Sequence, residues 1–188
     1  MRLTTALIAL AATGLFSAAA QSQTLIGGGK LAPSFPIVIN QPGSYKLAAD
    51  LVVPAGLDGI VVNADHVTLD LGGFSITGPG LCTGGYAQIS CNGRKTGVMG
   101  QKRNLTVRNG RVAGFGWGVS MFYGGLAEDL LVEHNASIGL AINNFALARG
   151  IRASYNNVGI DARSSMLRDS LIAYNTTGLT AMDRTLAD

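Results

Sequence analysis

The sequence predicts an all-β chain that winds as a solenoid, and a repeat between residues 96 and 182 is the main reason. A glycine followed by an apolar pair recurs at steps of 21, 21, 20 and 19 residues, at Gly97, Gly118, Gly139, Gly159 and Gly178. Such a period, with two strand-like segments per unit, is too short for a repeat of paired helices. It fits one coil of a β-solenoid, in which each repeat buries its apolar side by stacking on its neighbours.

Asparagine marks a second position in this repeat. Asn135, Asn156 and Asn175 keep the same step, and Gly110 is assigned to the equivalent place one coil earlier. Asparagine and glycine adopt positive φ more easily than other residues, which predicts a left-handed corner at this position. Amides stacked at one register can also hydrogen-bond along the column, as they do in stacked sheets.

The first 36 residues precede the repeat. Residues 1–20 have the form of an export signal, with Arg2 at the start, an apolar run and small residues before a cleavage site after about Ala20. We therefore expect a periplasmic or extracellular protein. No segment reaches the ~20 apolar residues that a membrane-spanning helix needs. Residues 21–36, which hold three consecutive glycines and two prolines, are predicted to be a linker.

Residues 37–188 are expected to form one solenoid domain. Short strands between 37 and 53 are predicted to cap its N-terminal end, because a solenoid end exposes unpaired strand edges. Residues 78–95 interrupt the period and are assigned to a loop insertion. Its two cysteines, Cys82 and Cys91, are predicted to form a disulfide, since the chain is expected to be exported and has an even cysteine count.

Several segments have the form of a known family. They are Pro-Gly-Ser-Tyr-Lys-Leu at 42–47, Gly-Ile-Val-Val at 59–62, Val-Thr-Leu-Asp-Leu-Gly-Gly-Phe at 67–74, and the strand-then-asparagine turns at 133–135 and 173–175. On these segments the chain resembles the right-handed parallel β-helix repeat proteins of the pectate-lyase-like superfamily, in their exported bacterial form. The resemblance implies a single-stranded right-handed parallel β-helix, here of about six short coils. It implies no single activity, because the family includes lyases, hydrolases, epimerases and members without a known reaction.

Composition limits the classes of partner. The chain is 47% hydrophobic and 13% charged, which suits a folded domain rather than a disordered one. Its 14 basic and 11 acidic residues form no extended run of one sign. Nucleic acid is therefore not expected as a partner.

One predicted column of outward side chains contains charged residues. Asp70, Arg108 and Glu133 are assigned to it, followed by Ser154 and Ala173. A ladder of salt bridges is one interpretation. The other is an acid–base pair, because Asp70 and Glu133 would lie two coils, or about 10 Å, apart, and inverting glycosidases separate their carboxylates by ~6.5–9.5 Å. Arg108 between them would keep both ionised. Glu128, Arg149 and Asp169 form a similar set, and a neighbouring column is assigned to Asn109, His134, Tyr155 and Tyr174.

The strand after each repeat glycine presents two further outward columns. One holds Asn63, Phe122, Asn143, Arg163 and Met182, and the other holds Val61, Met99, Ser120, Ala141, Asp161 and Thr180. Lyases of the resembled family bind Ca²⁺ through several aspartates on this face, whereas here Asp161 is the only acid. The paired aspartates and Gly-His-Gly of its polygalacturonases are also missing. We expect no metal and no cofactor, and the weak catalytic candidates are Asp70, Glu133, Asp161 and Arg163.

Aromatic and polar residues on the same face favour glycan binding. The candidates are Trp117, Phe122, Tyr123, Asn143 and Arg163. Aromatic rings offer apolar faces to sugar rings, and amide and charged groups offer hydrogen bonds. The alternative is that these aromatics cover the corners of a thin core.

Three functions remain open from the sequence. The first is a non-catalytic exported protein that binds extracellular or envelope polysaccharide or has a structural role. The second is a polysaccharide lyase or glycoside hydrolase. The third is an assembly subunit that stacks through an open C-terminal coil, because residues 183–188 are too short for an obvious cap.

Overall fold

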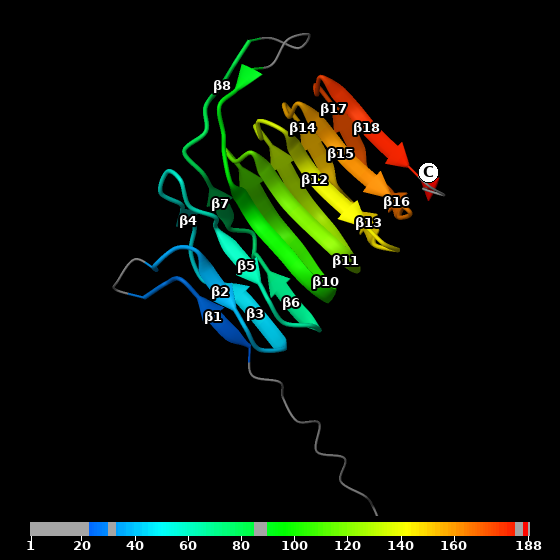
Figure 1. Cartoon of the computed structure of the whole chain (residues 1–188). Coiled ribbons are helices and arrows are strands. Elements are labelled where there is room, and N and C mark those ends of the chain that lie inside the picture. The colour runs from blue at the N-terminus through cyan, green and yellow to red at the C-terminus, as the bar shows by residue number, and fades with distance from the viewer. Residues whose placement is uncertain (1–22, 30–32, 85–89, 183–185, 188) are drawn as a thin grey trace, which may run out of the picture.

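The computed structural model describes residues 23–29, 33–84, 90–182 and 186–187. These residues form a β-solenoid of about seven turns, without a helix, in which a single sheet of 17 strands winds through successive coils (Figure 1). The coils stack in chain order, and every pairing within this sheet is parallel. The predicted all-β solenoid is confirmed.

Each coil contributes strands to three faces. Face 1 contains β2 (Ile37–Ile39), β5 (Ile60–Val62), the start of β10 (Thr96–Ala113), the start of β11 (Trp117–Glu133), β12 (Ile138–Asn143), β15 (Val158–Arg163) and β18 (Thr177–Met182). Face 2 contains β1 (Thr24–Ile26), β3 (Gly43–Leu47), β6 (Val67–Asp70), the middle of β10 and β11, β13 (Leu147–Arg149), β16 (Met166–Arg168) and β19 (Leu186–Ala187). Face 3 contains β4 (Leu51–Val52), β7 (Ser75–Thr77), the ends of β10 and β11, β14 (Arg152–Ser154) and β17 (Leu171–Ala173).

Aliphatic side chains fill the interior in register. On face 1, the inward column is Ile37, Ile60, Val98, Val119, Leu140, Ile160 and Leu179, and its members from Ile60 to Ile160 are fully buried. Full burial of one such side chain stabilises the fold by about 1.5–3 kcal/mol. Because strands alternate their side chains between two faces, the next residue along each strand points out of the solenoid.

The corner before face 1 is made by the residue that precedes each repeat asparagine. His134, Tyr155 and Tyr174 have φ values of 55°, 55° and 57°, and Gly114 has a φ of 78° at the same position one coil earlier. The prediction that asparagine itself adopts positive φ was therefore wrong. Gly110 was also misplaced, because it pairs with Leu130.

The repeat asparagines instead point inward and bond to one another. Nδ2 of Asn135 donates to Oδ1 of Asn156, and Nδ2 of Asn156 donates to Oδ1 of Asn175, both at 3.0 Å. Asn135 and Asn156 are fully buried. The predicted amide ladder is confirmed. Outside it, the rings of His134, Tyr155 and Tyr174 stack at 5.1 and 5.4 Å, as predicted, whereas Asn109 lies at a different corner, directly after Arg108.

The N-terminal segment forms more of the solenoid than the sequence indicated. β2, β3 and β4 pair with β5, β6 and β7, so the segment predicted as a cap supplies a complete coil. β1, inside the predicted linker, pairs with β3 and covers one edge of that coil. The added coil explains why the solenoid has about seven turns rather than six.

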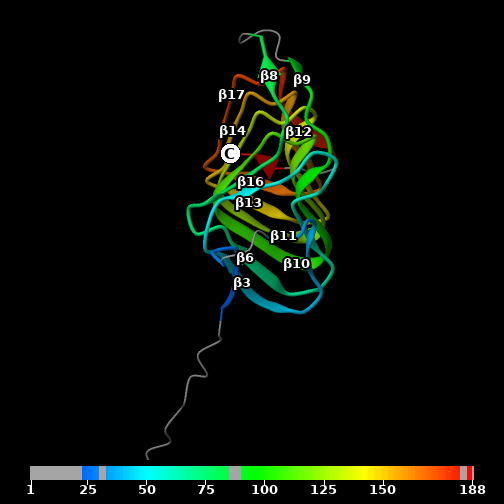
Figure 2. The same ribbon diagram turned by 90° about the vertical axis from the view of Figure 1, so that its left-hand side faces the viewer.

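The described parts of the insertion, 78–84 and 90–95, lie at the corner between faces 3 and 1 (Figure 2). Within it, β8 (Cys82–Thr83) and β9 (Ser90–Cys91) pair antiparallel, and the predicted Cys82–Cys91 disulfide is present. The backbone N–H of Gly80 donates to the carbonyl of Gly114 at 2.9 Å, which ties the insertion to the next coil. The expected export signal lies outside the described residues. In the described part of the chain, no helix has the length and apolar character to cross a membrane.

Candidate functional site

One outward column on face 1 forms a buried floor. Val61, Met99, Ser120, Ala141, Asp161 and Thr180 occupy it in the predicted register. Although these side chains point away from the interior, Ser120, Ala141 and Asp161 are only 1%, 2% and 7% exposed. Larger side chains beside the column rise above it, so the middle of face 1 is hollowed rather than flat.

The walls of this hollow carry the residues predicted to bind a ligand. A hollow of about 420 Å³ is lined by Trp117, Phe122, Tyr123, Asn143, Asn144, Asp161, Arg163 and Ser164. A second hollow of about 310 Å³ shares Trp117 and Phe122 with it and is also lined by Lys95, Thr96, Met99 and Ser120. We call the two together the aromatic groove. All five predicted binding residues line it, together with Ser164 and Lys95, which sequence reasoning missed.

Local backbone contacts position the aromatic wall. Trp117 is the first residue of β11, and its backbone N–H donates to the carbonyl of Lys95 at 3.0 Å, at the base of the insertion. The Nδ2 of Asn144 donates to the carbonyl of Phe122 at 2.7 Å. Asn144 itself turns the corner after β12 with a φ of 54°. Trp117 and Phe122 therefore sit on fixed backbone while about a third of each side chain stays exposed.

An ion pair forms the polar end of the groove. Nη2 of Arg163 lies 3.1 Å from Oδ2 of Asp161, and the two residues share the outward side of β15. The Asp161 carboxylate is nearly buried, whereas half of the Arg163 side chain is exposed. A guanidinium has five N–H donors, so Arg163 can bond to Asp161 and to a ligand hydroxyl or carboxylate at the same time.

Ser120 lies on the floor below Trp117 and Phe122. Its hydroxyl is buried and has no hydrogen-bond partner among the described residues. A buried polar group without a partner is uncommon and costs free energy. The sequence placed Ser120 in the correct column, but its burial follows from the height of the neighbouring rings, which a strand pattern does not reveal.

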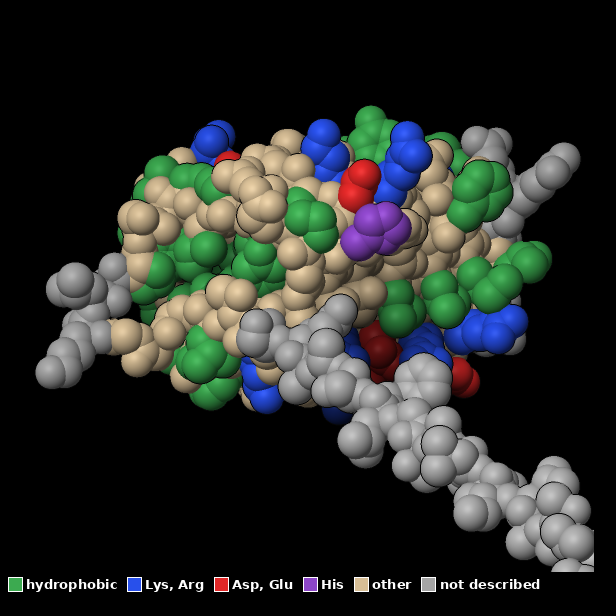
Figure 3. Space-filling view, turned by 90° about the horizontal axis from the view of Figure 1, so that it is seen from below, with side chains coloured by type: hydrophobic (Ala, Val, Ile, Leu, Met, Phe, Trp, Pro, Cys, Tyr) green, Lys and Arg blue, Asp and Glu red, His purple; other side chains and the backbone are tan. Residues whose placement is uncertain are grey.

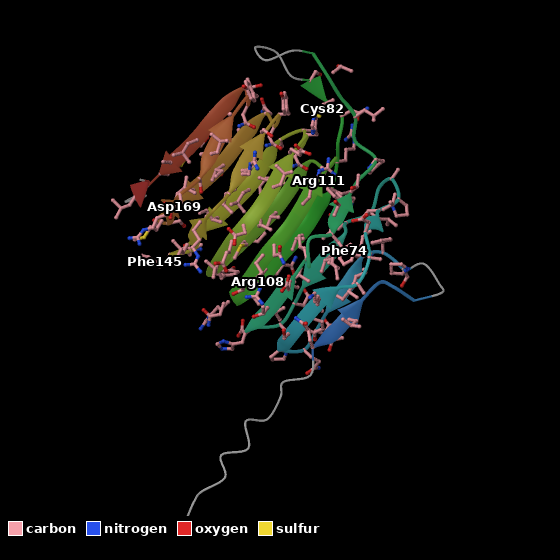
Figure 4. The ribbon with its side chains drawn as sticks, turned by 180° about the vertical axis from the view of Figure 1, so that it is seen from behind. Phe74, Cys82, Arg108, Arg111, Phe145 and Asp169 are labelled. Carbon is pink, nitrogen blue, oxygen red and sulfur yellow. A yellow bond between two sulfur atoms is a disulfide. The ribbon has the colours of Figure 1, made fainter. Side chains whose placement is uncertain are left out.

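The structure separates two of the predicted catalytic residues. Asp70 pairs with Arg108 on face 2, at 3.2 Å, and the next residue in that column is Glu128. Glu133 lies on face 3, where Nε of Arg111 donates to its Oε1 at 2.6 Å. The column assigned to Asp70 and Glu133 was therefore wrong. Figure 4 shows Arg108 and Arg111, the partners of these two carboxylates, at separate places along β10.

The other charged set is partly as predicted. Arg149 forms an ion pair with Glu128, and the two residues are aligned in adjacent coils. Asp169 is not the next member, because Arg168 pairs with Arg149 and Asp169 turns the following corner with a φ of 48°. Charged side chains of both signs lie next to one another on the face seen in Figure 3. These contacts fit a ladder of salt bridges.

No set of three or more His, Cys, Asp or Glu side chains that could hold a metal ion is found among the residues that the structure describes. Within the lining of the aromatic groove, Asp161 is the only carboxylate among the described residues. The groove thus offers rings, amides, one ion pair and one lysine as its chemistry.

Comparison of the chain with known proteins gave no match to a family model, to a curated protein or to a solved structure.

Proposed function

We propose that this chain is a non-catalytic exported β-helix protein that binds an extracellular or cell-envelope polysaccharide in the aromatic groove. One observation carries the proposal: Trp117, Phe122, Tyr123, Asn143 and Arg163, chosen as binding residues from the sequence, line one hollow of face 1. Rings beside amides and a guanidinium are the groups that hold a sugar by its apolar face and its hydroxyls.

The extent of the groove suits a linear chain of sugars. Its floor runs from Met99 through Ser120 and Ala141 to Asp161, which is three steps between adjacent coils. Neighbouring strands lie about 4.8 Å apart, so the floor is roughly 14 Å long. A ligand that extends along the solenoid would contact residues from four successive coils.

Export and the superfamily assignment are part of the same proposal. The Cys82–Cys91 disulfide is typical of an oxidising compartment outside the cytosol. The signal-like residues 1–20 and the segments that resemble the pectate-lyase-like superfamily agree with it.

A polysaccharide lyase or glycoside hydrolase is the less favoured function. Glycoside hydrolysis ordinarily uses two carboxylates on either side of the bond. Among the described residues, the groove contributes only the carboxylate of Asp161, which is bonded to Arg163, while Asp70 and Glu133 belong to other faces and are paired with arginines. The groove therefore supports binding better than catalysis.

The test is retention of the mature protein, from Gln21, on a glycan array and on polysaccharide affinity gels, with products followed by absorbance. We expect retention without unsaturated or shortened products. Trp117→Ala combined with Phe122→Ala should abolish retention while the far-ultraviolet circular dichroism stays unchanged. The matched control is Tyr174→Ala, an exposed aromatic outside the groove. Product formation, or retention that survives the double substitution, would overturn the proposal.

Self-association through the C-terminal coil is a second candidate. β17, β18 and β19 each pair with one strand among the described residues, and Leu171 and Leu186 are exposed on them. Exposed strand edges can pair with another chain. Sedimentation should then give a mass above that of the monomer, which Ala181→Glu lowers. A monomer over the whole concentration range would exclude this function.

A further inference from the structure

An apolar hollow lies beside the aromatic groove, at the corner between faces 1 and 2. It has a volume of about 660 Å³, and its apolar lining comes from Phe145, Ala146, Leu147, Met166 and Leu186. Two serines complete the described lining, and one of them, Ser165, already donates its hydroxyl to the carbonyl of Arg163 at 2.8 Å. No charged side chain is among the described lining residues. The hollow thus suits an alkyl group better than a polar one.

The apolar character of face 2 begins part-way along the solenoid. One outward column of face 2 begins with Ser44, Thr68 and Thr106. The same column continues as Leu126, Leu147, Met166 and Leu186. The change occurs at β11, the strand that also supplies Trp117 and Phe122. The solenoid therefore becomes apolar on face 2 at the coil where the aromatic wall begins on face 1.

Phe145 stands at the rim of the hollow. It is 88% exposed, and its backbone is left-handed with a φ of 66°. This conformation is unusual for a bulky residue, and a phenylalanine gains no burial from such a position. Figure 4 shows Phe145 at the edge of the solenoid, by its later coils. The ring is placed where a ligand in the hollow would contact it.

The hollow and the groove share the lining residue Ser164. Its carbonyl accepts a hydrogen bond from the backbone N–H of Phe145 at 2.8 Å. Asn144 lines the groove and directly precedes Phe145 in the chain. A ligand that extends beyond the polar end of the groove at Arg163 would reach the apolar hollow across Ser164.

We propose that the groove and the hollow form one site for an amphiphilic ligand, a saccharide that carries an alkyl or acyl chain. The sugar lies in the aromatic groove, and the alkyl or acyl chain of the ligand passes over Ser164 and contacts Phe145, Leu147 and Met166. The inference rests on the proposed function, because it uses the same groove for the sugar. A volume of this size is ordinary for a small-molecule site.

The test compares two ligands that differ only in the length of their alkyl chain. n-Octyl β-D-glucopyranoside and methyl β-D-glucopyranoside are titrated calorimetrically into the mature protein, below the micelle concentration of the octyl compound. We expect the octyl glycoside to bind at least tenfold more tightly, because burial of methylene groups is favourable. Two results would overturn the amphiphilic site and leave glycan binding intact. One is equal affinity for the two glycosides. The other is that neither glycoside binds although the protein is retained on a glycan array.

Substitutions show which residues contact the alkyl chain of the ligand and which contact its sugar. Phe145→Asn, which tolerates the left-handed backbone, should reduce the octyl preference at least fivefold without changing methyl glucoside binding. Leu81→Asn is the control, since Leu81 is an apolar side chain of similar exposure, 72%, outside the hollow. Trp117→Ala should weaken both glycosides. A single site made of the groove and the hollow would be contradicted in two ways. The preference for the octyl glycoside could survive Phe145→Asn, or Trp117→Ala could leave binding of the octyl glycoside unchanged. Failure of array retention would instead remove the proposed function itself.

Discussion

Asn156 shows how a single side chain holds three coils together. Its Oδ1 accepts from both the backbone N–H and the Nδ2 of Asn135, each at 3.0 Å. Its Nδ2 lies 3.0 Å from the carbonyls of Val132 and Ser154 and from Oδ1 of Asn175. Because the residue is fully buried, water cannot replace these partners when the side chain is removed.

We therefore predict that Asn156→Ala lowers the free energy of unfolding by about 3 kcal/mol, since it leaves buried donors without an acceptor. The adjacent Asn157→Ala is the control, because Asn157 is exposed. Urea denaturation of the two variants measures the difference. Equal stability of both variants would show that the ladder contributes little.

Ser120 presents the opposite case, a buried hydroxyl without a partner among the described residues. Ser120→Ala is predicted to leave stability unchanged or to raise it by about 1 kcal/mol, because it removes a desolvated polar group. Ser165→Ala, in contrast, loses the bond to the Arg163 carbonyl and should destabilise. Thermal unfolding of the two variants measures the difference. If Ser120→Ala lost as much stability as Ser165→Ala, the Ser120 hydroxyl would not be an unpaired buried group.

The sequence located these residues better than it assigned their roles. The repeat step identified Asn135, Asn156 and Asn175 and the amide ladder. It attributed the positive φ to asparagine, whereas the left-handed residue comes one position earlier and is histidine in one coil and tyrosine in two. Asparagine adopts the left-handed backbone conformation more easily than histidine or tyrosine does. The hydrogen bonds of the buried amide ladder outweigh this conformational preference.

At the scale of the strand, the repeat glycines serve close packing rather than a turn. A Cβ on Gly139 would lie 2.7 Å from the carbonyl oxygen of Gly159 and 2.8 Å from Nδ2 of Asn156. Neither Gly139 nor Gly159 has positive φ. The step of the repeat is thus set by a position where the next coil and the asparagine side chain leave no room for a side chain.

Gly139→Ala should accordingly cost about 1–3 kcal/mol through overpacking. Gly178→Ala, at the last coil of the same column, is the matched control, because its Cβ would meet nothing nearer than 3.7 Å. That substitution should be neutral or slightly stabilising, since alanine restricts the unfolded chain. Chemical denaturation of both variants provides the comparison, and a similar loss in each would exclude packing as the reason for the repeat.

Strand register also explains which columns the sequence assigned correctly. On face 1 each strand follows its glycine at a fixed distance, so the floor from Val61 to Thr180 was predicted in full. Faces 2 and 3 come after corners whose lengths differ between coils. Counted from Gly59 and Gly118, Asp70 and Glu133 lie 11 and 15 residues on, a larger difference than this variation, so placing the two carboxylates in one column was an error of register.

At the scale of the molecule, each coil contacts mainly the coils before and after it. β10 contacts strands of the neighbouring coils on all three faces, whereas β2 and β18 each pair with one strand among the described residues. Stability in such a stack is close to a sum of nearest-neighbour terms. The ends should open before the centre does.

Amide hydrogen exchange should therefore show a gradient along the solenoid. We expect the amides of Val119 and Leu140 to exchange only with global unfolding, and those of Val38 and Thr180 to exchange through local opening. Mass spectrometry of pepsin fragments measures the difference. Uniform protection from end to end would indicate a single cooperative unit and would contradict the stacked arrangement.

Much of the whole-molecule prediction came from periodicity, and what was missed depends on three-dimensional packing. The repeat predicted the solenoid, and its outward columns held Phe122, Asn143 and Arg163, three of the five groove-lining residues that were chosen for binding. The first coil was mistaken for a cap because 37–53 lacks the repeat glycine and asparagine, although its strands keep the register. The apolar hollow was missed because it forms at a corner. Corner residues such as Phe145 lie outside the alternating strand columns on which the predictions were based.

The floor of the groove receives one residue from each coil, at Met99, Ser120, Ala141 and Asp161. In evolutionary terms, duplication of a single gene segment of about 20 codons would insert one more coil. Because each coil of the groove has its own repeat glycine, the insertion would lengthen the groove by about 4.8 Å without disturbing the ends. The number of repeats in a lineage would then record the length of the ligand its members bind.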